Sequence, residues 1–86
     1  MLSDINEVQR QANKYGIGKI YPSERKDKKY MVIINNKKIH FGDPKYADFT
    51  YHKDLKRREA FRKRNAKWAT ANKDTPAFLS FNLLWG

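Results

Sequence analysis

One stretch, KYMVIINNKKIHF at residues 29–41, constrains the fold of this chain more than any other. Its two halves are rich in β-branched and aromatic residues, which favour extended strands. Asn35 and Asn36 stand between them, and asparagine readily adopts the positive φ angles that a two-residue hairpin turn requires. The stretch therefore predicts a β-hairpin with strands at residues 29–34 and 38–41. A further short strand, at residues 19–21, is expected before it and is closed by Pro22.

Helical patterns flank this sheet on both sides. Apolar residues recur at spacings of three and four along residues 4–15, after a cap at Ser3 and before Gly16, which predicts a helix. A basic helix is expected from about residue 54, and Thr75-Pro76 opens a third helical segment that ends at Trp85. We therefore expect one α+β domain over residues 1–86: an N-terminal helix, a small three-stranded antiparallel meander, a long basic helix and a short apolar C-terminal helix.

The charge of the chain favours a polyanionic partner. Its 86 residues suit one small domain, and 19 Lys and Arg residues against 9 Asp and Glu residues give a formal net charge of +10 at pH 7. Hydrophobic residues make up 40% of the chain, which argues against a disordered polycation. So high a charge on so small a domain favours nucleic acid or an acidic membrane surface as partner over charge that serves solubility alone.

Several functional classes find no support in the sequence. The chain has no cysteine, so a disulfide or a thiolate metal site is excluded. The two histidines lack the spacing of a metal or catalytic cluster, and GIG at residues 16–18 lacks the context of a phosphate-binding loop. No catalytic residue, metal or cofactor is predicted. The apolar runs are too short for a signal peptide or a membrane span, so an intracellular protein is expected.

The stretch HKDLKRREAFRKRNAKWATANKD, residues 52–74, predicts a helix with two faces. Cations gather on one arc: Lys53, Lys56, Arg57, Lys63, Arg64 and Lys67. Apolar residues gather on the opposite half: Leu55, Phe61, Ala66, Trp68 and Ala69. The basic face is almost purely positive, and like charges four residues apart destabilise a helix, whereas phosphates would relieve that repulsion. This face predicts nucleic-acid contact; a solvated face, or a protein or membrane surface, is the alternative.

A second basic cluster flanks the predicted hairpin and extends the candidate surface. It contains Lys26 and Lys29 besides four residues included in the predicted nucleic-acid site: Arg25, Lys28, Lys37 and Lys38. Lysines at a hairpin also serve to protect sheet edges, which is the alternative interpretation. Arg58 and Arg62 project from the apolar side of the basic helix, and they are expected either to extend to its rim or to pair with Asp43 or Asp48.

The C-terminal stretch PAFLSFNLLWG is apolar on almost every side. A helix of this kind is either central to a core or shared between chains, and a domain this small is not expected to enclose it fully. We therefore expect a homodimer centred on Phe78, Phe81, Leu84 and Trp85. The alternative is that the segment docks on the sheet and the N-terminal helix as core.

Particular motifs resemble those of a viral protein family. They are KDKKYMVIINNKKIHFGDPKYADFTYHKD at residues 26–54, RR at Arg57-Arg58, FRKRNAKW at residues 61–68 and LSFNLLW at residues 79–85. With these motifs the chain resembles small basic proteins encoded by giant (nucleocytoplasmic large) DNA viruses and some large tailed phages. Arg64-Asn65 departs from the Arg-His that many relatives carry. The strands followed by a helix also show a weaker, architectural likeness to AP2 and integrase-type DNA-binding domains.

The resemblance implies a viral origin, in the cytoplasm or nucleus of an infected host or packaged in the virion. Together with the charge, it predicts a non-enzymatic protein that binds nucleic acid through phosphates without sequence preference. Two alternatives remain open: a virion structural or assembly protein that binds an acidic viral protein, and an inhibitor of a host nucleic-acid enzyme. The choice between DNA and RNA is also open.

Overall fold

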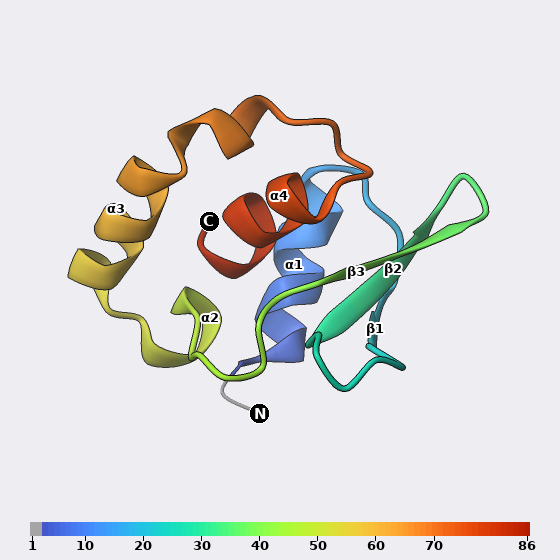
Figure 1. The fold of residues 1–86 in the computed structure, drawn as a ribbon, viewed down its shortest axis with the longest axis horizontal. Coiled ribbons are helices and arrows are strands. Elements are labelled where there is room, and N and C mark those ends of the chain that lie inside the picture. The colour runs from blue at the N-terminus through green and yellow to red at the C-terminus, as the bar shows by residue number, and fades with distance from the viewer. Residues whose placement is uncertain (1–2) are drawn as a thin grey trace.

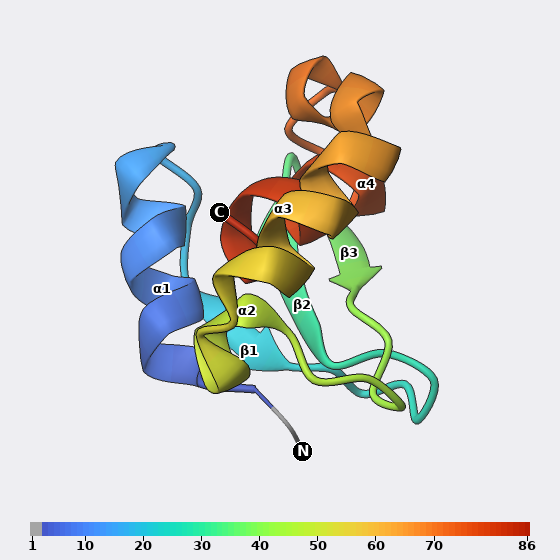
Figure 2. The ribbon, with the colours of Figure 1, turned by 90° about the vertical axis from the view of Figure 1, so that its left-hand side faces the viewer.

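Figures 1 and 2 show the fold in a computed structural model, which describes residues 3–86. The class is α+β, as the sequence predicts. The elements in chain order are helix α1 (Ile5–Lys14), strands β1 (Ile20–Pro22), β2 (Tyr30–Ile34) and β3 (Lys37–Phe41), helices α2 (Phe49–His52) and α3 (Leu55–Arg64), the 3-10 helix η1 (Ala66–Thr70), helix α4 (Pro76–Leu79) and the π-helical turn η2 (Ser80–Leu84).

The sheet is the predicted antiparallel meander, with strand order β1-β2-β3. Val32, on the central strand, pairs with Ile20 on one side and Ile39 on the other. Asn35 and Asn36 have φ angles of 51° and 65°, as a tight hairpin turn requires. The predicted hairpin is therefore confirmed.

Helix α1 begins and ends close to the predicted positions, but its cap is Asp4 instead of Ser3. The Asp4 carboxylate accepts a hydrogen bond from the backbone N–H of Asn6 at 3.0 Å, while the Ser3 hydroxyl lies 3.1 Å from the hydroxyl of Thr50. A carboxylate at the positive end of the helix is also favoured by the helix dipole. Gly16, at φ 66°, follows the helix in the left-handed conformation expected there.

The hydrophobic core lies between α1, the sheet and the C-terminal segment formed by α4 and η2. In Figure 1 this segment occupies the centre of the molecule, and it contacts α1, β3 and η1. Phe78, Phe81 and Leu84 are at most 6% exposed, and Trp85 is half-buried. The expectation that one domain could not enclose this helix is wrong, because the sheet and α1 cover it on two sides and α3 covers its end. Phe78, Phe81 and Leu84 belong to the core and Trp85 packs against it, so the structural reason for a homodimer at this segment is removed.

The predicted long basic helix is wrong in its extent. Lys53 adopts a left-handed conformation with φ 56° and separates α2 from α3, so His52 and Lys53 lie outside the basic helix. Asp54 then caps α3, accepting hydrogen bonds from the backbone N–H groups of Lys56 and Arg57. The helix ends at Arg64 because the side-chain amide of Asn65 donates to the Phe61 carbonyl at 3.1 Å and the chain tightens into η1.

Candidate functional site

Helix α3 lies at the outer edge of the molecule, away from the sheet (Figure 1). None of its residues is fully buried, and Leu55 is 66% exposed. The apolar stripe predicted on this helix is therefore wrong at Leu55. We call residues 55–70, which comprise α3 and η1, the basic arm.

Aromatic stacking attaches the basic arm to the body of the protein. The ring of Phe61 lies flat on the indole of Trp85, with centroids 4.5 Å apart and an interplanar angle of 7°. Trp68, brought back by the 3-10 turn, meets Phe61 edge-on at 6.0 Å. Such offset and edge contacts between aromatic rings add to the area that they bury. The arm is thus held in place through a small number of contacts.

Two arginines complete the attachment by binding the C-terminal carbonyls. Arg62 donates from Nη1 to the Trp85 carbonyl at 3.1 Å and to the Phe81 carbonyl at 3.4 Å, and Arg58 Nε lies 3.4 Å from the Trp85 carbonyl. The last carbonyls of a helix lack partners within the helix, and positive charge is favoured there. Burial, followed by the neighbouring charge of Arg58, lowers the pKa of Arg62. The pairing of these arginines with Asp43 or Asp48, one of the two expected outcomes, is wrong.

The ten cations predicted to contact nucleic acid divide into two groups. Four have acidic partners: Arg25 with Asp27, Lys38 with Glu24, Arg57 with Asp54, and Lys53 with Glu7. Within residues 3–86, the other six have no acidic side chain within ion-pair distance: Lys28, Lys37, Lys56, Lys63, Arg64 and Lys67. Four of these six belong to the basic arm, and all four are exposed.

Lys29 is not part of a basic surface, contrary to its place in the predicted second cluster. Its side chain and that of Asp48 are each 1% exposed, and Lys29 Nζ lies 2.9 Å from an Asp48 carboxylate oxygen. The other Asp48 oxygen accepts from the backbone N–H of Thr50 at 3.0 Å and so caps α2. The pair ties the residue that precedes β2 to the cap of α2.

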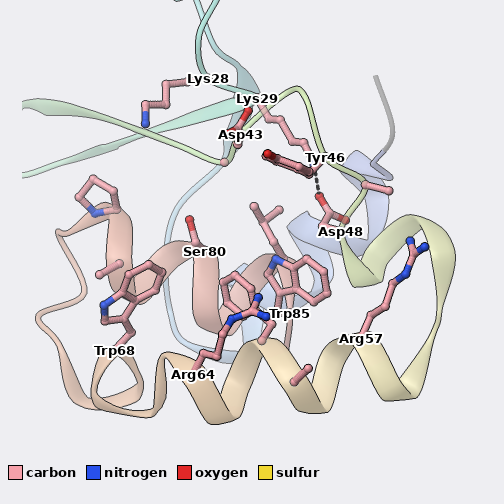
Figure 3. Close-up of a pocket in the computed structure, with 17 residues that line it drawn as sticks. Lys28, Lys29, Asp43, Tyr46, Asp48, Arg57, Arg64, Trp68, Ser80 and Trp85 are labelled. Atoms are coloured by element: carbon pink, nitrogen blue, oxygen red, sulfur yellow. Dashed lines mark hydrogen bonds and ion pairs between the residues drawn. The ribbon is translucent and has the colours of Figure 1, made fainter.

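A groove of about 800 Å³ runs between the basic arm and the body (Figure 3). Helix α3 forms one wall, the connection from β3 to α2 forms the opposite wall, and the C-terminal segment lies beneath. Arg57 and Arg64 project from α3 into the groove, and in this view Trp68 and Trp85 lie on either side of Arg64. Four aromatic residues line it: Tyr46, Phe61, Trp68 and Trp85. Sequence reasoning missed this groove; the interleaving of aromatic and basic residues along 57–68 was the available signal.

The ring of His52 lies against the indole of Trp85, with centroids 5.2 Å apart. Its Nδ1 accepts a hydrogen bond from the backbone N–H of Asp54 at 2.9 Å, while its buried Nε2 has no partner among residues 3–86. Burial, and after it the charge of Arg57, lowers the pKa of His52. Neutral His52 therefore carries its proton on Nε2 and positions the start of α3.

Residues 3–86 contain no cluster of three His, Cys, Asp or Glu residues arranged to hold a metal ion. No helix in this part of the chain has the length and apolar character needed to cross a membrane.

The molecule is thus a small α+β domain whose basic arm borders an aromatic groove. The chain belongs to a family of unknown function (DUF5754), whose model matches residues 18–65, more than half of the chain. This match covers the sheet, α2 and α3, and it ends before Trp68 and the C-terminal segment. No curated protein and no solved structure matches the chain.

Proposed function

We propose that this protein is a non-enzymatic nucleic-acid-binding protein that contacts phosphates through its basic arm with little regard to base sequence. The observation that carries the proposal is the arm itself, which presents four exposed cations that have no acidic partner among residues 3–86: Lys56, Lys63, Arg64 and Lys67. The formal net charge of +10 would attract a polyanion to this surface from a distance.

The energetics of the arm support this proposal. Residues 55–70 carry seven Lys and Arg residues and one acidic residue, Glu59, so the like charges of the arm repel one another. Phosphate oxygens would neutralise that charge, and each phosphate contact would release a condensed counterion from the nucleic acid. Binding would therefore relieve repulsion that the free protein carries.

The side chains of the arm are suited to phosphates more than to base edges. Asparagine and glutamine are common readers of adenine in the major groove. Asn65 is the one such residue between positions 55 and 70, and its amide is already bonded to the Phe61 carbonyl. Phosphate contacts fix position without reading sequence, so little discrimination among sequences is expected.

Affinity for random-sequence duplex DNA is expected to fall about a hundred-fold between about 50 and 200 mM salt, because four phosphate contacts each release a counterion. Fluorescence anisotropy with several unrelated duplexes and with RNA of matching sequence measures this directly. Affinities that ignore salt, or that differ strongly among unrelated duplexes, would contradict the proposal. Absence of binding to DNA and RNA at low salt would favour the alternative of a virion assembly protein that binds an acidic viral partner.

The motif resemblance supports placing this activity in a large DNA virus or phage, inside the infected host. A packaged, genome-associated protein and a replication accessory protein are both consistent with binding that does not depend on sequence. In either role the DNA or RNA chain itself is the partner, and no cofactor is required.

A further inference from the structure

The groove beside the basic arm has the size and lining of a ligand site. Its volume of about 800 Å³ falls in the range of small-molecule pockets. Phe61, Trp68 and Trp85 are each half-buried, and Tyr46 is 67% exposed, so their rings remain partly open to a ligand. Among residues 3–86, Tyr46 takes no part in the ring stacking that attaches the arm, so its exposed ring is available to a ligand.

We propose that this groove binds the unpaired bases of single-stranded nucleic acid, while the cations of the basic arm hold the adjoining phosphates. The inference rests on the proposed function and adds to it a preference for single strands. A base in a duplex is stacked between its neighbours and is unable to enter the groove, whereas a base in a single strand has a free face.

The charges around the groove complement a phosphodiester chain. Lys28, Arg57 and Arg64 line the groove. Of residues 3–86, two acidic residues line it as well: Asp48, which is paired with the buried Lys29, and Asp43. Arg57 is held loosely by Asp54, with a separation of 3.6 Å between Nε and the carboxylate, and both side chains are exposed. Such an exposed pair exchanges readily for a phosphate. The groove therefore combines net positive charge with aromatic faces, as single-strand binding sites do.

The groove is also largely formed before any ligand enters. The stacked rings of Phe61 and Trp85 fix one side of it, and the buried Lys29–Asp48 pair fixes the opposite wall at the start of α2. A preformed site loses less conformational entropy on binding. Because every base has an aromatic face, stacking in this groove is expected to tolerate any base sequence.

The test compares two strands that have the same phosphates but differ in their bases: a fluorescent oligothymidine and an abasic deoxyribose strand of equal length. The natural chain is expected to bind oligothymidine roughly ten-fold more tightly than the abasic strand, through stacking of bases. Tyr46→Ala is expected to remove most of this difference and to leave the affinity for the abasic strand unchanged, because Tyr46 lies outside the basic arm. Trp68→Ala should also reduce the difference between the two strands. Quenching of tryptophan fluorescence should accompany binding of oligothymidine alone.

Tyr51→Ala is the matched control, because Tyr51 is similarly exposed, at 55%, and does not line the groove. The Tyr51→Ala variant should keep the same preference for oligothymidine over the abasic strand as the natural chain. Tyr46 is more exposed than Trp68, so Tyr46→Ala is expected to leave the fold intact. It therefore tests the inference even if Trp68→Ala loosens the arm.

Equal affinity for the two strands would overturn the inference and leave phosphate binding by the arm standing. Loss of binding to both strands would overturn the inference together with the proposed function. Thymidine monophosphate that binds as tightly as oligothymidine, or a polyglutamate peptide that displaces it equally well, would show a different occupant and would likewise overturn the inference.

Discussion

Replacing Asp48 with serine is expected to lower the free energy of unfolding by about 3–5 kcal/mol, because it leaves the ammonium group of Lys29 buried without its counter-charge. Serine keeps an oxygen at the cap of α2, so the loss reports the ion pair more than the cap. Natural domains have only about 5–15 kcal/mol of stability in total. Chemical denaturation followed by circular dichroism measures the change.

Two further variants make this prediction specific. The double variant Lys29→Met/Asp48→Ser removes both charges and keeps a long side chain at position 29, so it should be more stable than Asp48→Ser alone. Glu24→Ser breaks the exposed pair with Lys38, in which both side chains are more than half exposed, and should have little effect. If Asp48→Ser and Glu24→Ser lowered the free energy of unfolding by similar amounts, burial of the Lys29–Asp48 pair would not be what makes it important for stability.

Reversing the charge at Lys56, Lys63 and Lys67 is expected to weaken binding to nucleic acid by about a hundred-fold or more, because three phosphate contacts and their counterion release are lost. The three side chains are exposed and have no acidic partner among residues 3–86, so the fold should remain intact by circular dichroism and thermal melting. Each glutamate that replaces one of these lysines would also repel the phosphates. Anisotropy at constant salt measures the loss.

Reversal of Lys14, Lys19 and Lys73 is the matched control for this experiment. These exposed lysines lie outside the basic arm and the groove, and their reversal also removes six charges from +10, leaving +4. Their loss should weaken binding far less, through long-range attraction alone. Equal weakening by both triple variants would mean that net charge, and not the arm, governs binding.

The parts of the fold that were predictable from the sequence depend on local rules. The hairpin follows from Asn35-Asn36 between two β-branched runs, and α1 follows from an apolar stripe between a cap and Gly16. Both signals lie within a few residues of the structure that they specify. Neither depends on what the rest of the chain does.

The incorrect predictions concern features that depend on contacts distant in sequence. The basic stretch carries helix-forming residues up to Lys67, but Asn65 caps the Phe61 carbonyl and the helix stops. The partners of Lys29 and Arg62 lie 19 or more residues away, so nothing beside them in the sequence distinguishes them from surface cations. The C-terminal segment becomes core only because α1, the sheet and the arm converge on it.

The predicted nucleic-acid site likewise has one part that local sequence predicts and one part that depends on contacts distant in sequence. The exposed cations Lys56, Lys63 and Lys67 are predictable from charge and helical position, because they need no partner. The groove beside them required knowledge of how Tyr46 and Trp85 meet the arm, since they lie 39 residues apart in the sequence. The aromatic residues within the basic stretch 57–68 indicate a candidate binding site, but the geometry of the groove is known only from the fold.

Chemical-shift mapping by NMR tests the central claim most directly, because it shows which residues of the folded protein contact the ligand. A short single-stranded oligonucleotide would be titrated into the ¹⁵N-labelled chain. The amides of residues 55–70 and the indole N–H signals of Trp68 and Trp85 are expected to shift, while the amides of α1 and β1 stay in place. Shifts confined to α1 and the sheet, or no shift at low salt, would contradict this claim.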